Sequence, residues 1–304
     1  MTTLAFFEGE IVPIDQAKVC ITNHTFNYGT GCFAGIRGYW NDSHQQLYVF
    51  RLFDHFERFL HSAKLMHSDI AYSNEQLQES TLALLRAENW TENVYIRPIA
   101  YKNKSFFQVW LHDAQDKVAI FSQPVGGYLR DDHGIKACVS SWRRVDDTTM
   151  PARGKINGTY VNSSLAKSDA LLGGFDEALL LNQDGHLSEA TAANFMIVRH
   201  GCLITPPVYA NLLEGIVRKS LIELAAGIGI PVEERQIDRS ELYFADEAFF
   251  CGTGVQMAAV SSIDHRTIGT GQKGPVARQL GDLFHSVLIG ENPDFQHWLT
   301  PVYV

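Results

Sequence analysis

The sequence centres on Met150-Pro151-Ala152-Arg153-Gly154-Lys155-Ile156-Asn157-Gly158-Thr159-Tyr160, where a lysine stands between two glycines and a tyrosine follows five residues later. A strand pattern at 135–142 precedes this segment, and a helical pattern at about 160–172 follows it. A lysine amine is almost fully protonated at neutral pH, so a lysine that attacks a carbonyl must be desolvated or already bonded to a carbonyl group. Taken alone, Lys155 fits a solvated loop lysine as well as a catalytic one.

The length and composition indicate a globular protein of two domains. The chain has 304 residues, 45% of them hydrophobic and 19% charged, which is enough to build large cores. A glycine-rich stretch at 124–132 has the composition of a linker. We therefore expect a small domain at 1–123 and a larger one, carrying Lys155, at 133–304. The net charge of −9 argues against nucleic acid or an anionic membrane as a partner.

Two features favour a cytoplasmic location. The first residues lack the basic and apolar regions of a signal peptide, and no apolar run reaches the ~20 residues of a membrane span. The five cysteines are widely scattered and form no CxxC pair, which is typical of reduced, mostly buried thiols.

Hydrophobic periodicity predicts short strands and hairpins mixed with separate helices, which indicates an α+β fold with mixed and antiparallel sheets and helices packed around them. Pro98 within the strand pattern at 94–102 places that strand near an edge or a bulge. Ser73-Asn74-Glu75-Gln76 is a capping-box pattern at a helix start. The predicted helices are 51–67, 73–89, 160–172, 215–227 and one after Pro275; the predicted strands are 94–102, 117–122, 135–142, 248–251 and 257–263, with hairpins at 6–12, 177–190 and 194–205.

Three further segments have features of an anion-binding site. Leu213-Glu214-Gly215-Ile216-Val217-Arg218 opens a helix, and the amides of Ile216 and Val217 can hold phosphate oxygens. Arg58, on the predicted helix 51–67, can add a charged hydrogen bond. Gly252-Thr253-Gly254-Val255 is a turn with a hydroxyl and exposed amides. Each of these alone also fits an ordinary helix start, a surface ion pair or a plain turn.

One acidic residue completes the set. Ser188-Glu189-Ala190-Thr191-Ala192-Ala193-Asn194-Phe195 places Glu189 beside small residues at a strand end, although an exposed glutamate has the same pattern. A lysine amine, a phosphate cradle, a lone acid and a nearby tyrosine together suit pyridoxal 5'-phosphate. The carboxylate would keep the ring nitrogen protonated, and Tyr160 would hydrogen-bond the ring hydroxyl. The segment 180–191 lacks the ligands of a calcium loop, and we expect no metal.

Together these residues resemble the branched-chain amino acid aminotransferases, in the fold-type IV group of pyridoxal-phosphate enzymes, which includes the D-amino-acid aminotransferases. The resemblance runs nearly from end to end. It rests on Phe7-Glu8-Gly9-Glu10, on Tyr28-Gly29-Thr30-Gly31-Cys32-Phe33-Ala34-Gly35-Ile36-Arg37, on Tyr95-Ile96-Arg97-Pro98, on Val139-Ser140-Ser141-Trp142-Arg143-Arg144, on 155–165, on Ser188-Glu189 and on the turns at Gly215 and Gly252.

The resemblance implies a role for each matching residue. Lys155 would bond the cofactor and move the proton of the substrate, Glu189 would pair with the ring nitrogen, and Tyr160 would bind the ring hydroxyl. The matching phosphate ligands are Arg58, Ile216, Val217 and Thr253. The matching substrate residues are Tyr28, Phe33, Tyr128 and Tyr160 for the side chain, Tyr95, Gly254 and Val255 for the α-carboxylate, Arg97 for the distal carboxylate of glutamate, and Arg37 in the same substrate region.

The implied reaction is a ping-pong transamination between branched-chain L-amino acids (leucine, isoleucine and valine) and 2-oxoglutarate, through a pyridoxamine phosphate form. One pocket must then hold both an isobutyl group and a carboxylate, although an unpaired buried charge is strongly unfavourable. An arginine at the pocket rim, Arg97, resolves this without making the pocket polar. The resemblance also implies a homodimer or a higher homo-oligomer.

The sequence departs from the family pattern at several positions. Ala34 stands where glutamate is usual, Glu214 where proline is common, and Val217 where threonine is common. Other or broadened specificity, toward (R)-amines or D-amino acids, therefore stays open, because one methylene contributes only ~1–3 kcal/mol of discrimination. The segment 100–107 lacks the arginine–histidine cluster of the D-amino-acid enzymes. A pyridoxal-phosphate lyase and a non-catalytic scaffold of this fold are the remaining alternatives.

Overall fold

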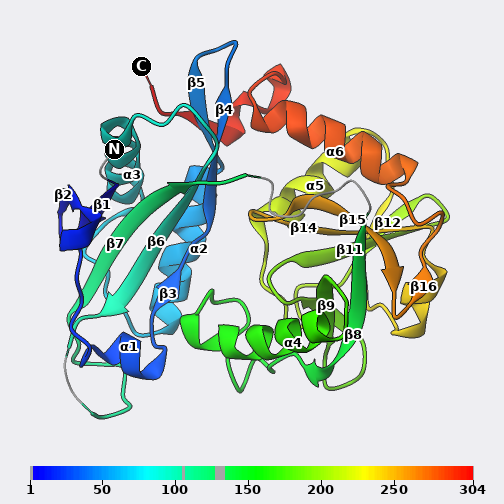
Figure 1. Cartoon of the computed structure of the whole chain (residues 1–304), viewed down its shortest axis with the longest axis horizontal. Helices are drawn as coiled ribbons and strands as arrows, with labels where there is room; N and C mark the ends of the chain where they lie inside the picture. The colour runs from blue at the N-terminus through cyan, green and yellow to red at the C-terminus, as the bar shows by residue number, and fades with distance from the viewer. Residues whose placement is uncertain (1–2, 105–106, 127–133, 304) are drawn as a thin grey trace. The chain divides into compact units, whose positions relative to one another are not determined.

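The computed structural model describes residues 3–104, 107–126 and 134–303 (Figure 1). Contacts divide the chain into two compact units: unit 1 comprises 1–126, 154–158 and 286–304, and unit 2 comprises 127–153 and 159–285. Each unit combines a sheet with helices, so the predicted α+β class with mixed and antiparallel sheets is confirmed. In the described ranges no helix is long and apolar enough to cross a membrane.

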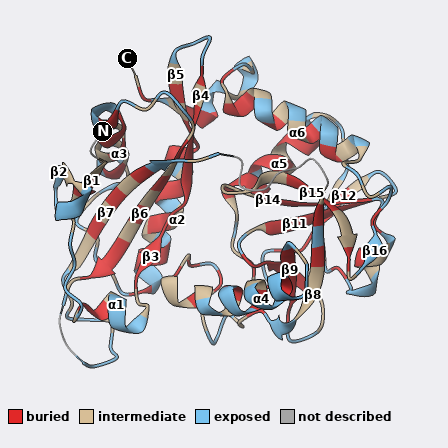
Figure 2. Cartoon of the chain, in the orientation of Figure 1, coloured by how far each residue is buried: buried red, intermediate tan, exposed pale blue. Residues whose placement is uncertain are grey.

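Unit 1 is built on an antiparallel sheet in the order β17-β5-β4-β6-β7-β1-β2, with β3 paired to β6. The buried core includes Phe56, Leu84 and Ile96, from α2, α3 and β6 (Figure 2). Its strands are β1 (Leu4–Phe7), β2 (Glu10–Pro13), β3 (Cys32–Phe33), β4 (Ile36–Asn41), β5 (Gln46–Phe50), β6 (Val94–Lys102), β7 (Asp116–Pro124) and β17 (Leu299–Pro301), and its helices are α1 (His24–Tyr28), α2 (Leu52–Leu65) and α3 (Asn74–Glu88), with 3-10 turns η1 (Ile14–Gln16) and η5 (Pro293–Trp298).

Two segments far along the chain join unit 1 by strand pairing. Ile156 forms a β-bridge with Cys32, and β17 pairs with β5. Lys155 therefore groups with unit 1, whereas the sequence placed it in a continuous C-terminal domain. The predicted linker at 124–132 stays a prediction, because 127–132 lie outside the described residues.

β6 is an interior strand, so of the two alternatives for Pro98, an edge or a bulge, the sheet edge is wrong, and Pro98 lies instead at an interruption of the ladder. β6 pairs with β7 along its length, and its other side is shared by β3, which ends at Phe33, and β4, which begins at Ile36. Pro98 lies at the break between these two strands, where its carbonyl accepts a hydrogen bond from the Ala34 amide at 3.0 Å. The missing N–H therefore falls where the ladder is already interrupted.

Unit 2 is built on a mixed sheet in the order β10-β9-β8-β15-β14-β11-β12-β13, with β16 paired to β15. The pairs β8–β9, β8–β15 and β12–β13 are parallel and the others antiparallel. Its strands are β8 (Ile135–Arg143), β9 (Glu177–Leu181), β10 (Leu187–Ala190), β11 (Asn194–Arg199), β12 (Cys202–Thr205), β13 (Val232–Glu234), β14 (Glu247–Gly252), β15 (Gln256–Ile263) and β16 (Arg266–Thr267), and its helices are α4 (Tyr160–Leu172), α5 (Ile216–Gly227) and most of α6 (Pro275–Leu288), with the 3-10 turn η4 (Ser240–Phe244).

Several elements of both units lie where local sequence signals predicted them. The Ser73 hydroxyl and the Gln76 side chain form the expected capping box at the start of α3. The hairpins β1–β2, β9–β10 and β11–β12 lie where the sequence placed them.

The cysteines differ from expectation, because two are buried, two are partly buried and Cys20 is exposed, although all five are free thiols.

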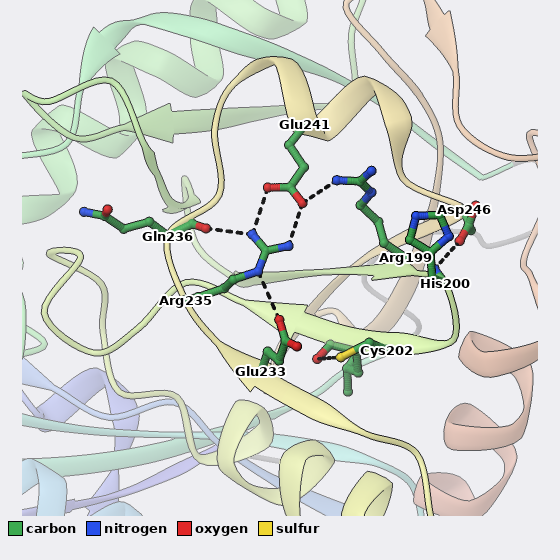
Figure 3. Close-up of polar contacts among 9 residues, drawn as sticks. Arg199, His200, Cys202, Glu233, Arg235, Gln236, Glu241 and Asp246 are labelled. Carbon is green, nitrogen blue, oxygen red and sulfur yellow. Dashed lines mark hydrogen bonds and ion pairs between the residues drawn. The ribbon is translucent and has the colours of Figure 1, made fainter.

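An ion-pair network covers part of unit 2 (Figure 3). The Glu241 carboxylate lies 2.6 Å from Arg235 and 2.7 Å from Arg199, and Arg235 also reaches Glu233 at 3.1 Å. Hydrogen bonds from Arg235, followed by those from Arg199, lower the pKa of Glu241 to about 2. The network therefore joins β11 and β13 to the 3-10 turn at 240–244.

Candidate functional site

Backbone hydrogen bonds hold the Lys155 segment against unit 1. The Phe33 amide donates to the Lys155 carbonyl at 3.0 Å. The Lys155 amide donates to the hydroxyl of Ser62 on α2 at 3.1 Å. That hydroxyl in turn donates to the Arg58 carbonyl at 2.9 Å. One serine therefore links the lysine backbone to the helical turn that carries Arg58.

The Lys155 side chain is half-buried against an aromatic ring. Its Nζ lies 5.1 Å from the centroid of the Phe33 ring, which is itself buried on β3. This is within the range of a cation–π contact. Lys155 is thus an ordered, partly desolvated lysine, and the fully solvated loop reading does not fit its surroundings.

The buried face of α2 carries His55 near three cations. Burial, followed by the charges of Arg58, Lys155 and Arg51, holds the pKa of His55 well below its usual range. Its Nδ1 has no hydrogen-bond partner among the described residues. The concentration of positive charge at this face suits an anion. Sequence reasoning missed His55 and Ser62, although both share a helical face with Arg58, from which they lie three and four residues away.

A cluster on β3 and β6 brings together three predicted substrate residues. Arg97 donates to the Tyr95 hydroxyl at 2.9 Å, and its guanidinium carbon lies 4.3 Å from the Phe33 ring centroid. The Arg97 Nε has no hydrogen-bond partner within the described chain. Gly35 makes room for this arrangement, because a Cβ there would overlap the Tyr95 hydroxyl.

The other predicted substrate residues are more dispersed. Arg37 is buried on β4 and donates to the Gly126 carbonyl at 3.1 Å. Tyr28 ends α1, is 40% exposed and packs against the His24 ring. Tyr128 lies outside the described residues.

In unit 2, Glu189 is a buried carboxylate on β10 with three strong donors. Arg144 Nη2 lies 2.7 Å from Oε1. Oε2 accepts from Asn194 Nδ2 at 3.0 Å and from the Leu213 amide at 3.2 Å. The alternative of an exposed glutamate is therefore wrong, because Glu189 is 5% exposed. Sequence reasoning gave Arg144 and Asn194 no role, although both lie in segments that it singled out.

The start of α5 lies next to this carboxylate. Asn194 Nδ2 also donates to the Leu213 carbonyl at 2.9 Å, and its Oδ1 occupies the space that a Cβ at Gly215 would need. No side chain caps the helix at Gly215 in the described chain. Ile216 and Val217, both buried, begin the helix, so their amides have no partner within its first turn.

Two further predicted cofactor ligands, Thr253 and Tyr160, also belong to unit 2. The tight turn between β14 and β15, whose last pair is Gly252 with Gln256, is formed by Thr253 and the predicted substrate residues Gly254 and Val255. Tyr160 is the first residue of α4. The roles of these residues stay predictions, as do those of the unit 1 residues.

Comparisons with known proteins agree on one family. The model of the amino-transferase class IV family matches residues 31–263. A probable branched-chain-amino-acid aminotransferase of Aquifex aeolicus is 45% identical over 300 residues, which cover 98% of this chain and 96% of the relative.

Solved structures give the same result over the whole fold. The branched-chain aminotransferase of Thermoproteus uzoniensis, crystallised with norvaline, matches with a TM-score of 0.96 and 40% identity over 100% of both chains. The branched-chain amino acid aminotransferase of Thermobaculum terrenum, in its PLP-bound holo form, matches with a TM-score of 0.96 and 36% identity over 100% of both chains.

Proposed function

We propose that this chain, which belongs to the class IV aminotransferase family, transfers the amino group of branched-chain L-amino acids to 2-oxoglutarate with pyridoxal 5'-phosphate as cofactor. The matches to the family model and to the Aquifex aeolicus relative confirm the family resemblance inferred from the sequence. The observation that carries the proposal is the near full-length match to branched-chain aminotransferases, 45% identical over 98% of the chain. A non-catalytic scaffold is a poor alternative, because the lysine, the acid and both glycine turns are present.

The chemistry of the donor set fits this cofactor. Unit 1 offers a partly desolvated lysine beside an electropositive helix face, and unit 2 offers a buried, charge-paired carboxylate beside an uncapped helix start. The lysine suits an aldehyde, the helix face and the helix start suit a phosphate, and the carboxylate suits a ring nitrogen. The bound cofactor supplies an electron-poor ring that accepts the negative charge left when the Cα proton of the substrate is removed.

In unit 1 we assign Lys155 two tasks: it would hold the cofactor covalently, and its amine, once the amino group of the substrate has replaced it, would move the proton at the substrate Cα. Its backbone is fixed by hydrogen bonds with Ser62 and Phe33, so only the side chain has to move. Arg58 binds the phosphate, supported by the positive charge of its helix face.

In unit 2 we assign Glu189 to the ring nitrogen and Tyr160 to the ring hydroxyl. The amides of Ile216 and Val217 and the hydroxyl of Thr253 bind the phosphate. Val217 lacks a side-chain hydroxyl, but its backbone amide is unaffected by that substitution, so the helix start retains its capacity to bind an anion.

Arg97 explains how one site would accept both leucine and glutamate. Its guanidinium packs on the Phe33 ring and donates to Tyr95, while a buried Nε lacks a partner within the described chain. An apolar substrate then meets the aromatic surface, and the distal carboxylate of 2-oxoglutarate meets a charged donor. Phe33, Tyr28, Tyr128 and Tyr160 are assigned to the substrate side chain, Tyr95, Gly254 and Val255 to the α-carboxylate, and Arg37 to the same region.

An absorbance experiment tests the proposal. The purified protein loaded with pyridoxal phosphate should lose its visible band on adding L-leucine, gain the band of the pyridoxamine form, and recover on adding 2-oxoglutarate. Lys155→Ala should bind the cofactor without this reversible change. D-alanine and an (R)-amine serve as substrate controls, and a response to these alone would replace the branched-chain assignment by the alternative specificity. Pyruvate release without an acceptor would instead identify a lyase.

The proposal includes a cytoplasmic homodimer or higher homo-oligomer. Its support is a group of exposed apolar side chains in unit 1, where Ile21, Phe26, Phe107 and Val109 are 71–78% exposed. A hydrogen bond from the His24 ring to the Gln108 carbonyl holds the two segments together. Exposed apolar groups of this kind typically mark an interface. Sedimentation equilibrium should give at least twice the 34.0 kDa chain mass, and a monomer at micromolar concentration would contradict this part.

A further inference from the structure

Arg144 is a buried arginine held by its backbone and by two of its guanidinium nitrogens. It follows β8 directly, is 5% exposed, and its backbone amide donates to the Leu181 carbonyl at 2.9 Å. Its Nε donates to the Asn211 carbonyl at 3.1 Å, which leaves Nη2 aimed at Glu189 at 2.7 Å. In the described chain, Glu189 is the acidic partner of Arg144.

Two other groups near this site in the described chain are already paired or neutral. Arg218 and Glu189 each influence the pKa of the Cys251 thiol, but Arg218 is paired with its own carboxylate, Glu234, at 2.6 Å. Burial raises the pKa of the Cys251 thiol to about 12, so the thiol is neutral at pH 7. Two further donors to Glu189, the Asn194 side chain and the Leu213 amide, are neutral.

A charge next to the Glu189 carboxylate matters because a proton shared between this carboxylate and a ring nitrogen can be bonded to either group. On the ring nitrogen it gives an ion pair, and on the carboxylate it gives two neutral groups. Burial favours the neutral arrangement, since both charges lose their hydration. A cation on the far side of the carboxylate reverses this preference, because it stabilises the charged form of the acid.

We propose that Arg144 is a positioning residue that keeps the shared proton on the ring nitrogen of the bound cofactor rather than on Glu189. The inference rests on the proposed function, in which Glu189 meets that nitrogen. An opposite charge at this distance shifts a proton equilibrium about tenfold to a thousandfold. A protonated ring withdraws electrons more strongly, so both halves of the transamination depend on Arg144, although it touches neither substrate nor cofactor.

The test is nitrogen-15 NMR of the holoenzyme loaded with ring-labelled pyridoxal phosphate. In the unmodified protein the ring nitrogen should be protonated at pH 7 and still protonated at pH 9, because the arginine keeps its charge. In Arg144→Met and Arg144→Gln the signal should move toward the unprotonated position, and kcat should fall about 10- to 100-fold with leucine and with glutamate alike. Arg144→Lys should restore both properties in part.

Three results would overturn the inference. The ring nitrogen could stay protonated in the Met and Gln variants, or the Lys variant could lose the ring proton and kcat as completely as they do. The third result is a ring nitrogen of the unmodified protein that loses its proton between pH 7 and pH 9. The last measurement needs no variant, so it decides even if the substitutions prevent folding. Arg143→Met is the matched control, because Arg143 is the exposed neighbour at the end of β8, and it should leave the signal unchanged.

Failure of the proposed function gives a different pattern. If the unmodified protein binds no cofactor, or if Glu189→Gln leaves the ring nitrogen protonated, then the assignment of Glu189 is wrong. If Glu189→Gln removes the proton while Arg144→Met does not, the assignment of Glu189 survives and only the role of Arg144 fails.

Discussion

Gly215 should be intolerant of even one added methyl group. A Cβ there would overlap Asn194 Oδ1 and lie 3.2 Å from its Cγ, so the asparagine amide has to move. That amide donates to Glu189 at 3.0 Å and to the Leu213 carbonyl at 2.9 Å. The Gly215→Ala substitution therefore acts through Asn194 rather than through the backbone, whose φ of −72° suits any residue.

The size of the effect follows from the two hydrogen bonds. A bond to a charged acceptor contributes about 1.5–3 kcal/mol and a neutral one about 0.5–1.5 kcal/mol, so losing both lowers the free energy of unfolding by about 2–4.5 kcal/mol. The matched control is Gly227→Ala at the other end of α5, where an added Cβ meets nothing within 4 Å. There the substitution should be neutral or stabilising by up to about 1 kcal/mol.

A double-mutant cycle measured by equilibrium urea unfolding of the apoprotein tests the cause. In an Asn194→Ala background the overlapping oxygen is gone, so Gly215→Ala should lower the free energy of unfolding by less than about 1 kcal/mol. The coupling energy between the two substitutions should then reach about 1–3 kcal/mol. An equal cost of Gly215→Ala in both backgrounds would refute the reasoning, since it would place the penalty in the glycine backbone.

Three further outcomes are expected. Arg97→Ala should lower turnover of 2-oxoglutarate and glutamate about 100-fold, since it removes a charged partner, with the KM for leucine nearly unchanged; equal losses in steady-state kinetics would contradict its role. Gly35→Ala should raise the KM for leucine about tenfold, because the added Cβ displaces the Tyr95 hydroxyl; an unchanged KM would show that this hydroxyl is not needed. Glu241→Gln should cost about 1–2 kcal/mol at pH 7 after solvent screening. Arg235 lowers the pKa of Glu241 from 4.5 to about 2, so this stability is present above pH 4.5 and is lost as the pH falls toward 2; a difference in urea midpoint between the two proteins that did not narrow on acidification would argue against the network.

Elements with strong local signals could be predicted from the sequence. The capping residues of α3, the Gln183-Asp184-Gly185 turn between β9 and β10, and the glycines after α4 fix their element ends by nearest-neighbour chemistry. Such signals act within four residues, so no knowledge of the rest of the chain is needed. The strand pair β4–β5 was not predicted, because glycine and polar residues at 35–46 interrupt its alternation.

Long-range partners explain where the structure differs from what the local sequence suggests. Pro98 indicated an edge or a bulge because proline lacks an N–H, and the break between β3 and β4 accommodates it in the sheet interior. The grouping of Lys155 with unit 1 depends on the bridge between Cys32 and Ile156, more than a hundred residues apart in sequence. Neither arrangement has a local signature.

The same limit separates the residues that sequence reasoning found at the candidate site from those it missed. Lys155 and Glu189 were found because their segments match the family pattern, although each alone also fitted an ordinary loop lysine or an exposed glutamate. Arg144 reaches Glu189 because β9 lies between β8 and β10 in the sheet, so the end of β8 faces a strand that is not its hydrogen-bonded neighbour. Strand order is set by packing of the whole unit, and a residue that acts through another is therefore found only once that order is known. If the Arg144 inference holds, part of the protonation chemistry of this enzyme is determined by sheet topology, because the charge that controls it comes from two strands away.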